Sequence, residues 1–338
     1  MSTFDLEHSR KIRVAWLYHV EGLTQDGIAQ RLGITRVRVQ RLLAQAREEG
    51  IVRVTISDPI SETIVLAAQL KDIFGLREAI VTPTPDDAAH VRTYIGHAAA
   101  EYLRSILREG MSFGVGWGTT LVETARALGP SPLPGSRVVA LMGGLTRSSA
   151  LNPHEIAWQL AQNLQGECYY LAAPTYADSL AAREAIIGQP SIREVLQRGR
   201  AVDVALVSVG TLDTASTMRR SGLLSDEDVR ALEEAGTVGD ILGRQFDAQG
   251  LLVASEVNER VISISPDSLR QIETVILMSG GLEKVRAIRG ALRARYADVL
   301  VIDEAAAATL VAAEQEAKIG DGRESLSIED GVYTRAGG

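Results

Sequence analysis

The sequence predicts an α/β fold class, with an N-terminal winged helix-turn-helix domain followed by a doubly wound, mostly parallel sheet. Three observations support this. Capped helical segments ending in glycine fill residues 1–50. From Glu78 onward, short apolar runs alternate with helical runs, as parallel strands buried between helices do. Residues 1–56 carry nine Lys and Arg against six Asp and Glu, a net charge of +3, whereas the whole chain carries −8. This asymmetry indicates a small polyanion-binding segment on an acidic body.

Composition excludes several classes of protein. The chain has 338 residues, 46% of them hydrophobic, and a single cysteine, Cys168. One cysteine allows no disulfide within the chain and no cysteine-based zinc site, and no HxxxH pair or dense carboxylate cluster predicts another metal site. The first residues are charged and lack a signal-peptide core, and no apolar run approaches 18 residues. We therefore expect a cytoplasmic protein without a membrane segment, metal or cofactor.

Three helices are predicted in the first fifty residues. The first spans about 5–20. The second begins after Thr24, a good N-cap residue, and ends at Gly33, and the third begins after Thr35 and ends at Gly50. Only two residues separate the second helix from the cap of the third. This short turn containing a glycine is typical of a helix-turn-helix.

The third helix has two distinct faces at 100° per residue. Its core face collects Val39, Leu42, Leu43 and Ala46. Its opposite face collects Arg36, Val37, Gln40, Arg41 and Ala44, with Arg38 at the boundary. In a major groove, arginine pairs with guanine, glutamine with adenine, and valine contacts the thymine methyl group. Thr35 and the first helix amides can hold a phosphate. Three arginines alone would also fit a solvated basic helix, but the caps and the short turn favour double-stranded DNA recognition.

Residues beyond the third helix predict a wing and a pairing segment. Residues 51–57 alternate apolar side chains with period two, as the strand that starts a wing does. Residues 61–74 are amphipathic and predict a linker or pairing helix, so we expect a homodimer or a homotetramer. The predicted domains are a DNA-binding domain over 1–57, a linker or pairing helix over 58–76, and a large domain over 77–338.

The large domain alternates strands and helices. The predicted strands are 79–81, 112–116, 137–142, 202–210, 274–280 and 298–303. The predicted helices are about 86–108, 119–128, 153–165, 225–235, 281–294 and 304–318. In open parallel sheets, ligands bind beyond the carboxyl ends of the strands. The segments that follow the predicted strands are therefore the candidate binding residues.

Two glycine-rich segments follow predicted strands and could hold an anion. The segment GVGWGTTL, residues 114–121, runs from a strand into three glycines and two threonines at a helix start. Glycines let backbone amides approach an anion, although packing alone explains many such turns. The segment SGGLEKVRAIRGAL places Lys284 in the first turn of a helix. A cation there is electrostatically unfavourable without an anion, so it indicates a ligand.

Two further segments are candidates. Gly143 and Gly144 follow the strand at 137–142, and VGDILGRQFDAQG contains Asp240 and Asp247. Neither segment contains the glycine spacing of a dinucleotide-binding fingerprint or a P-loop lysine.

The N-terminal segment resembles a known family. The stretch GLTQDGIAQRLGITRVRVQRLLAQAREEGIVRVTI is similar to the start of the SorC family of bacterial sugar-responsive transcriptional regulators, whose pattern resembles LTQ-x-x-IA-x-x-LGIS-R-x-x-V-x-R-LL. Thr35 replaces the commoner serine and keeps the cap chemistry. The resemblance implies the following DNA-binding residues: Thr24, Gln25, Thr35, Arg36, Val37, Arg38, Gln40 and Arg41.

The four segments of the large domain resemble the SorC effector domain, which is similar in fold to ribose-5-phosphate isomerase and glucosamine-6-phosphate isomerase/deaminase. The resemblance covers nearly the whole chain. It implies phosphate contacts from Gly116, Gly118, Thr119, Thr120 and Lys284, with Trp117 in the same loop. It also implies hydroxyl contacts from Asp240 and Asp247, and a backbone wall at Gly143 and Gly144.

Two hypotheses about function follow. In the first, the protein is a transcriptional regulator that binds a DNA operator, and a sugar phosphate, sugar or polyol effector alters that binding. In the second, it is a sugar-phosphate isomerase-like enzyme with a DNA-binding appendage. An isomerase requires a general base, for which Asp240, Glu155 or Glu256 are candidates. A complete DNA-binding module would be idle in an enzyme, so we expect the regulator and no enzymatic activity.

Overall fold

The computed structural model describes residues 3–48, 51–52, 59–146, 151–213 and 216–329. The chain divides into two compact units, residues 1–58 and 59–338. Each unit has its own hydrophobic core.

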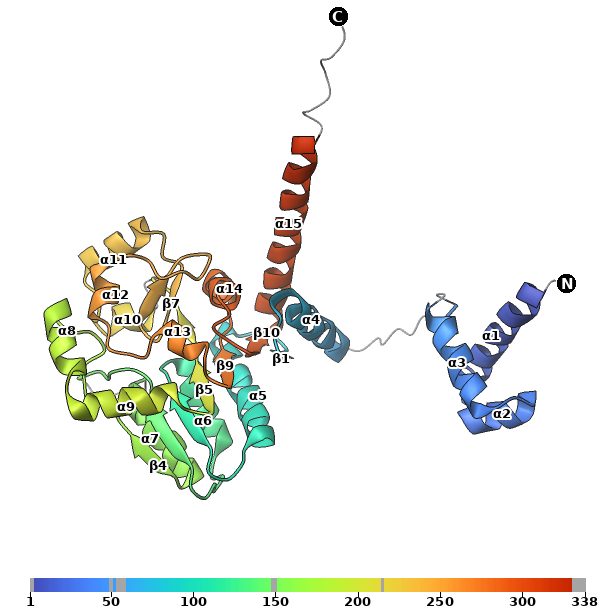
Figure 1. The fold of residues 1–338 in the computed structure, drawn as a ribbon, viewed down its shortest axis with the longest axis horizontal. Helices are drawn as coiled ribbons and strands as arrows, with labels where there is room; N and C mark the ends of the chain where they lie inside the picture. The colour runs from blue at the N-terminus through green and yellow to red at the C-terminus, as the bar shows by residue number, and fades with distance from the viewer. Residues whose placement is uncertain (1–2, 49–50, 53–58, 147–150, 214–215, 330–338) are drawn as a thin grey trace, which may run out of the picture. The chain divides into compact units, whose positions relative to one another are not determined.

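The first unit is a three-helix bundle of α1 (Thr3–His19), α2 (Gln25–Leu32) and α3 (Arg36–Glu48) (Figure 1). Its core collects Val14, Leu17, Ile28, Val39, Leu42 and Leu43. The apolar residues of α1 and α3 that enter this core are spaced three to four apart, which places them on one face of each helix.

The helix boundaries of this unit follow from capping chemistry. The Thr24 hydroxyl accepts the Gly27 N–H at 3.2 Å, and the Thr35 hydroxyl accepts the Arg38 N–H at 3.3 Å. Gly33 ends α2 with φ 64°, a left-handed conformation that glycine adopts without strain. These contacts confirm the predicted helix-turn-helix. The predicted wing strand lies largely outside the described residues, and the described Ile51 and Val52 are not in a strand.

The second unit is built on a seven-stranded sheet in the order β1-β10-β9-β5-β2-β3-β4. Its strands are β1 (Glu78–Thr82), β2 (Ser112–Val115), β3 (Arg137–Ala140), β4 (Glu167–Tyr169), β5 (Val204–Val207), β9 (Thr274–Met278) and β10 (Val299–Asp303). All neighbouring strands in it pair in parallel. Strands β5, β9 and β10 are buried along their whole length, as expected for strands covered on both faces.

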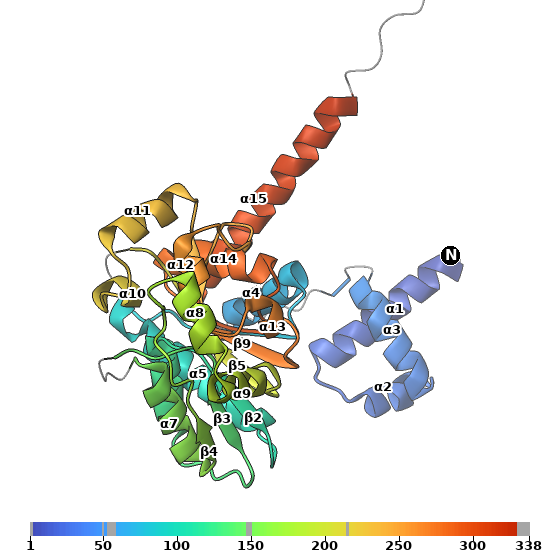
Figure 2. The same ribbon diagram turned by 60° about the vertical axis from the view of Figure 1, so that its left-hand side comes forward.

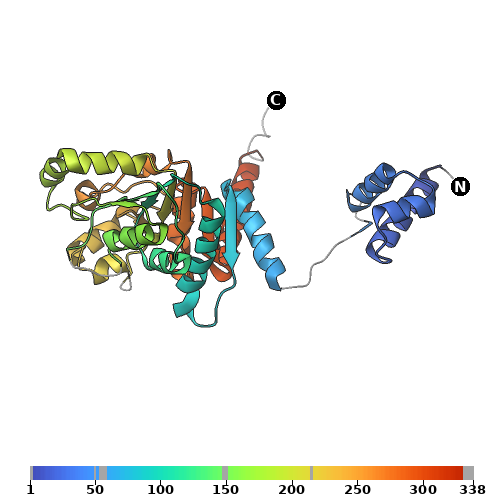
Figure 3. The same cartoon turned by 90° about the horizontal axis from the view of Figure 1, so that it is seen from below.

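Helices cover both faces of this sheet. The longer ones are α4 (Pro59–Phe74), α5 (Val91–Ile106), α6 (Thr119–Leu128), α7 (Pro153–Leu164), α8 (Leu180–Ile187), α9 (Pro190–Arg200), α11 (Asp226–Glu234), α14 (Val285–Arg293) and α15 (Glu304–Glu329). Helices α5, α6 and α7 pack side by side, and Figure 3 shows α5 and α4 on opposite sides of β1. The predicted doubly wound sheet is confirmed. The predicted linker or pairing helix, α4, packs against β1 and α15 within this unit.

A small antiparallel sheet lies beside the large one, and the sequence did not predict it. It comprises β6 (Val209–Gly210), β7 (Gly239–Ile241) and β8 (Arg244–Phe246). Three short helices, α10 (Thr217–Arg220), α12 (Glu256–Arg260) and α13 (Pro266–Leu269), also escaped prediction, as did β4, α8 and α9. Figures 1 and 2 show α10, α11 and α12 gathered around the small sheet. Elements of two to five residues contain too few positions to show a hydrophobic period.

The strand order determines where a ligand can bind. In the sheet, β3 and β4 lie on one side of β2, whereas β5, β9 and β10 lie on its other side. The order therefore reverses between β2 and β5. In open parallel sheets, the crevice at such a reversal, outside the carboxyl ends of the strands, is the usual binding site.

Candidate functional site

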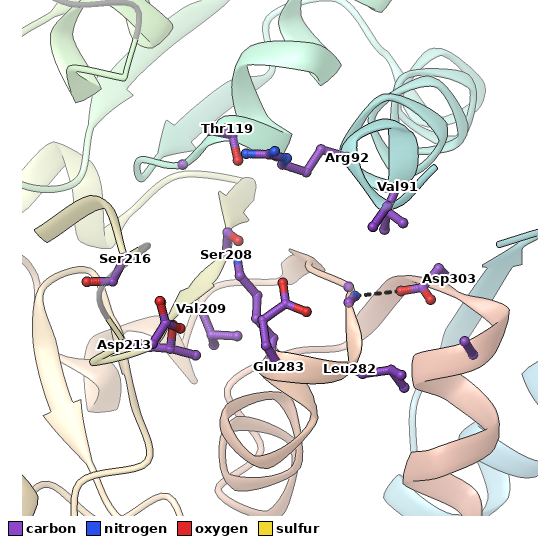
Figure 4. Close-up of a pocket in the computed structure, with 18 of the residues that line it drawn as sticks. Val91, Arg92, Thr119, Ser208, Val209, Asp213, Ser216, Leu282, Glu283 and Asp303 are labelled. Atoms are coloured by element: carbon purple, nitrogen blue, oxygen red, sulfur yellow. Dashed lines mark hydrogen bonds between the residues drawn. The ribbon is translucent and has the colours of Figure 1, made fainter. Parts of the chain in front are cut away.

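A cavity of about 500 Å³ opens at this reversal. Segments that follow five different strands line it: 84–88 after β1, 117–119 after β2, 208–213 after β5, 280–284 after β9, and 303 and 305 at the end of β10. Val91, Arg92, Ser216, Met218, Arg220 and Asp240 complete its wall. Figure 4 shows Arg92 and Thr119 on one side of the cavity, with Asp213 and Glu283 on the other.

The loop after β2 is shaped by glycine. Gly118 has φ 135°, which side-chain-bearing residues rarely adopt, and a Cβ there would lie 3.4 Å from the Cβ of Ser208. Helix α6 starts directly after it at Thr119, so its first amides have no partner within the helix. Trp117, Gly118 and Thr119 line the cavity, as the sequence predicted.

Asp240 is a buried acid of the cavity, with 2% of its surface exposed. Its Oδ2 accepts the Gly243 N–H at 3.1 Å, and its Oδ1 lies directly over Gly210, where no side chain would fit. Burial raises the pKa of Asp240 to about 6, although the Gly243 N–H, the Lys284 ammonium and the Trp117 indole favour the charged form. The carboxylate can therefore accept further hydrogen bonds near neutral pH.

Lys284 is the half-buried cation of the cavity, at the end of a short 3-10 helix, η2 (Leu282–Lys284). Burial lowers its pKa, against the charges of Glu283 and Asp240. Among the described residues, the structure records no hydrogen bond or ion pair of this ammonium group. The Arg92 guanidinium is directed toward Thr119 in Figure 4 and adds a second positive charge.

Several cavity residues were not predicted from the sequence. Ser208 and Asp213 follow β5, and Asp303 ends β10, so the rule that ligands bind at carboxyl ends of strands could have found them. Asp303 is structural here. Its carboxylate accepts the Gly281 N–H at 2.7 Å and the Thr84 hydroxyl at 3.2 Å, and so holds two cavity loops together. Arg92 begins α5 and carried no signal in the sequence.

The structure does not bring some predicted residues to the cavity. Asp247 does not line it, because its Oδ1 accepts the Gln249 and Leu251 N–H groups, both at 2.9 Å, within a tight turn. The Gly143 Cα packs against the Pro174 carbonyl, and Gly144 packs against His154. Gly116 and Thr120 are buried beneath the loop instead of lining its open side. Glycine here permits close packing as well as ligand approach, and the sequence does not distinguish the two.

The outer face of α3 is as the sequence predicted. The residues exposed on it are Thr35, Arg36, Val37, Arg38, Gln40 and Arg41, whereas Val39 and Leu42 are buried. On α2, Thr24 is exposed and Gln25 is half-buried. The Arg36 guanidinium lies 3.4 Å from the Asp26 carboxylate, and both side chains are mostly exposed. No pattern in the sequence predicted this ion pair.

The described part of the chain shows two absences. No group of three or more His, Cys, Asp or Glu side chains within it could hold a metal ion. None of its helices is long and apolar enough to cross a membrane.

Comparison with known proteins identifies both units. A family model described as "Putative sugar-binding domain" matches residues 58–312, and one described as "Homeodomain-like domain" matches residues 5–54. The chain is 35% identical over 303 residues to the deoxyribonucleoside regulator of Bacillus subtilis (strain 168), which covers 89% of this chain and 96% of that protein. It is 32% identical over 309 residues to the erythritol catabolism regulatory protein EryD of Brucella abortus (strain 2308), covering 91% and 98%.

A solved structure agrees with these relatives. The full-length sorbitol operon regulator SorC from Klebsiella pneumoniae superposes with a TM-score of 0.70 at 29% identity, covering 90% of this chain and 98% of that one. The relatives are named as regulators, which supports a DNA-binding regulator with a sugar effector over an isomerase-like enzyme. Because the helix-turn-helix and the sugar-binding domain occur here in one chain, as in these relatives, the chain belongs to the SorC family of sugar-responsive bacterial transcriptional regulators.

Proposed function

We propose that the effector is a phosphorylated sugar or polyol and that it binds in the cavity at the carboxyl ends of the large sheet. The observation that carries this proposal is Lys284, a half-buried ammonium without a recorded ion pair among the described residues, on a cavity wall. A buried cation is costly unless an anion compensates it. A phosphate group would supply that anion.

The surrounding groups fit a phosphate. The backbone at Gly118 and the hydroxyl of Thr119 stand at the start of α6, where unpaired amides and the helix dipole favour a negative charge. Arg92 also lines this cavity. We therefore assign the phosphate to Lys284 and the 118–119 loop.

Asp240 fits the sugar end of the ligand. A carboxylate accepts hydrogen bonds from two neighbouring hydroxyls, and such charge-assisted bonds are stronger than neutral ones. Its low exposure means that a sugar hydroxyl would replace little competing water. We assign Asp240 to the effector's hydroxyl groups.

The first unit would read a palindromic operator as part of a dimer or larger assembly. Arg36, Val37 and Gln40 face outward on α3, in position for base edges of the major groove. On α4, Ile64 and Val65 are 61% and 55% exposed. Two such apolar side chains next to each other fit the predicted self-association through this helix. Effector binding would then favour one arrangement of the paired DNA-binding units over another.

Calorimetric titration with matched ligand pairs tests the proposal. Ribitol 5-phosphate and ribitol differ only in the phosphate, so we expect the phosphorylated ligand to bind at least about tenfold tighter. Lys284→Ala should weaken the phosphorylated ligand about ten- to a hundredfold and ribitol only slightly. Arg286→Ala removes an exposed cation two residues away and is the control.

Equal binding of the two ligands would contradict the phosphate assignment. Equal affinity for the two ligands in the wild type would place the phosphate site elsewhere or show a neutral polyol effector. Asp240 would then be the main contact. Operator binding of Lys284→Ala without ligand should equal that of the wild type, since the substitution leaves α3 unchanged.

A further inference from the structure

Behind the cavity wall lies a buried glutamine with an unsatisfied side chain. Gln245, on β8, is 0% exposed, and its Oε1 has no hydrogen-bond partner. Its Nε2 makes two long contacts, 3.4 Å to the Gly243 carbonyl and 3.6 Å to the Met218 sulfur, and the Gln245 amide also lies beside the Tyr176 hydroxyl. A buried amide left in this state costs free energy, and such groups require an explanation.

The backbone holds this side chain toward the cavity. Asp240 and Gln245 stand directly opposite each other in the antiparallel pair of β7 and β8, so their side chains project to the same face. Asp240 lines the cavity. Asn258 fixes Gln245 from behind: its Oδ1 accepts the Gln245 N–H at 2.8 Å, and its Nδ2 donates to the Gln245 carbonyl at 2.9 Å. The backbone of Gln245 is therefore held in place, which fixes the direction in which its side chain leaves β8.

Met218 separates Gln245 from the cavity. It lines the cavity, is 2% exposed, and its sulfur contacts the Gln245 amide and, at 3.2 Å, the Tyr176 hydroxyl. Sulfur is a weak hydrogen-bond acceptor, so it is a poor partner for the Gln245 amide, and the Tyr176 hydroxyl already donates to the Gly243 carbonyl at 2.6 Å. Methionine is also unbranched and flexible, and it changes rotamer more readily than other large apolar residues. Its side chain can therefore leave this position at low cost.

We propose that Met218 is a displaceable plug and that a hydroxyl of the effector takes its place, donating to Gln245 Oε1 and accepting from Gln245 Nε2. This inference rests on the proposed function, since it continues the polyol chain from Lys284 past Asp240 toward β8. Gln245 would then recognise the end of the polyol that is remote from the phosphate. Met218 would determine the length of polyol beyond which binding affinity no longer rises.

A ladder of phosphorylated polyols tests this inference by calorimetry. Glycerol 3-phosphate, erythritol 4-phosphate, ribitol 5-phosphate and sorbitol 6-phosphate share the phosphate and differ in length. Gln245→Leu should weaken the longest ligand that the wild type binds well by about tenfold or more, and leave glycerol 3-phosphate unchanged. Because leucine replaces a buried amide with an unsatisfied oxygen, the melting temperature of Gln245→Leu should not fall below that of the wild type. Met218→Ala should move the affinity plateau to a longer ligand.

A matched control separates this effect from general stability. Ser136 also has a buried hydroxyl without a partner, but it precedes β3 at the amino end of the sheet, opposite the cavity. Ser136→Ala should leave both the melting temperature and all four affinities unchanged. Two results would overturn the inference: an equal loss of affinity for short and long ligands in Gln245→Leu, or an unchanged ligand length of highest affinity in Met218→Ala. Tight binding of the phosphorylated ligands by the wild type would still support the proposed function.

The unphosphorylated ladder of glycerol, erythritol, ribitol and sorbitol covers the remaining case. If the wild type binds only these, the phosphate assignment fails, but the same length dependence at Gln245 and Met218 still upholds the inference. If the wild type binds neither ladder, the polyol effector class is wrong and the inference falls with it.

Discussion

The charged groups of the two units stand in opposite environments. On α3, Arg36, Arg38 and Arg41 are all exposed and come from a span of six residues. In the cavity, Asp240 is buried and Lys284 is half-buried, and they reach one site from β7 and from η2. Exposed charges act at long range and are screened by salt, whereas buried ones act through contact and desolvation. The two surfaces should therefore respond differently to salt, pH and substitution.

Salt concentration should produce the largest difference between operator binding and effector binding. If the paired recognition helices make about six to ten phosphate contacts, operator affinity should fall about 10³- to 10⁵-fold between 50 and 200 mM salt. Effector affinity should fall less than about tenfold, because the cavity charges are poorly accessible to ions. Fluorescence anisotropy on an operator selected from random DNA, beside calorimetry with the best-bound polyol phosphate, measures both. Equal salt slopes would remove the contrast.

The second largest effect should be a pH dependence of stability that comes from Asp240. Burial raises the pKa of Asp240 from its ordinary value of 3.8 to about 6 in the folded protein. An acid whose pKa is higher in the folded protein than in the unfolded chain stabilises the folded state when it is protonated. This stabilisation is fully present below the pKa of the unfolded chain and is lost as pH rises through about 6. Relative to Asp240→Asn, the wild type should therefore lose up to about 3 kcal/mol of unfolding free energy between pH 4 and 7.

Urea unfolding of both proteins at several pH values between 4 and 7 tests this expectation. A constant difference between wild type and Asp240→Asn would show that Asp240 titrates as an exposed carboxyl does.

Base recognition by α3 should show a smaller effect. Arg36 lies in the first turn of α3 and its side chain is mostly exposed. Arg36→Ala should cost about 1–3 kcal/mol on the operator and relax the preference at one base position. Anisotropy on the operator and on random DNA distinguishes the roles. The same loss on both DNAs would reassign Arg36 to a phosphate contact.

The ion pair between Arg36 and Asp26 should have the smallest effect. Both side chains are mostly exposed, and such pairs contribute little to stability. Asp26→Asn removes a negative charge beside the DNA-binding arginine, so operator affinity should rise by a few-fold, under about 1 kcal/mol. Gel-shift titration measures the change. Weaker binding would show that Asp26 is needed to orient the guanidinium for its base.

The same contrast explains what the sequence could predict. The faces of α3 follow from helical period alone, and the caps at Thr24 and Thr35 follow from residue type, so both were predicted correctly. Of the residues predicted to bind the effector, Trp117, Gly118, Thr119, Asp240 and Lys284 line the cavity. These five lie in segments that resemble the family's pattern.

The failures lie where contacts are distant or elements are short. Asp240 and Asp247 looked equivalent in the sequence, but one lies on β7 above Gly210 and the other closes a turn with its own backbone. Arg92 lines the cavity, and Gln245 lies behind its wall, only because α5 and the β7-β8 hairpin pack as they do. No local pattern encodes that packing.

The arrangement of the cavity also bears on how the protein is made. The helix-turn-helix is a continuous stretch whose core forms within about fifty residues, so it can fold soon after its synthesis. The cavity needs the ends of β1 and β10, which pair across more than two hundred residues. Strand β10 is made late, and the cavity cannot exist before it joins the sheet. A nascent or truncated chain would thus acquire the DNA-reading surface before it could sense an effector, so responsiveness is a property of the completed chain alone.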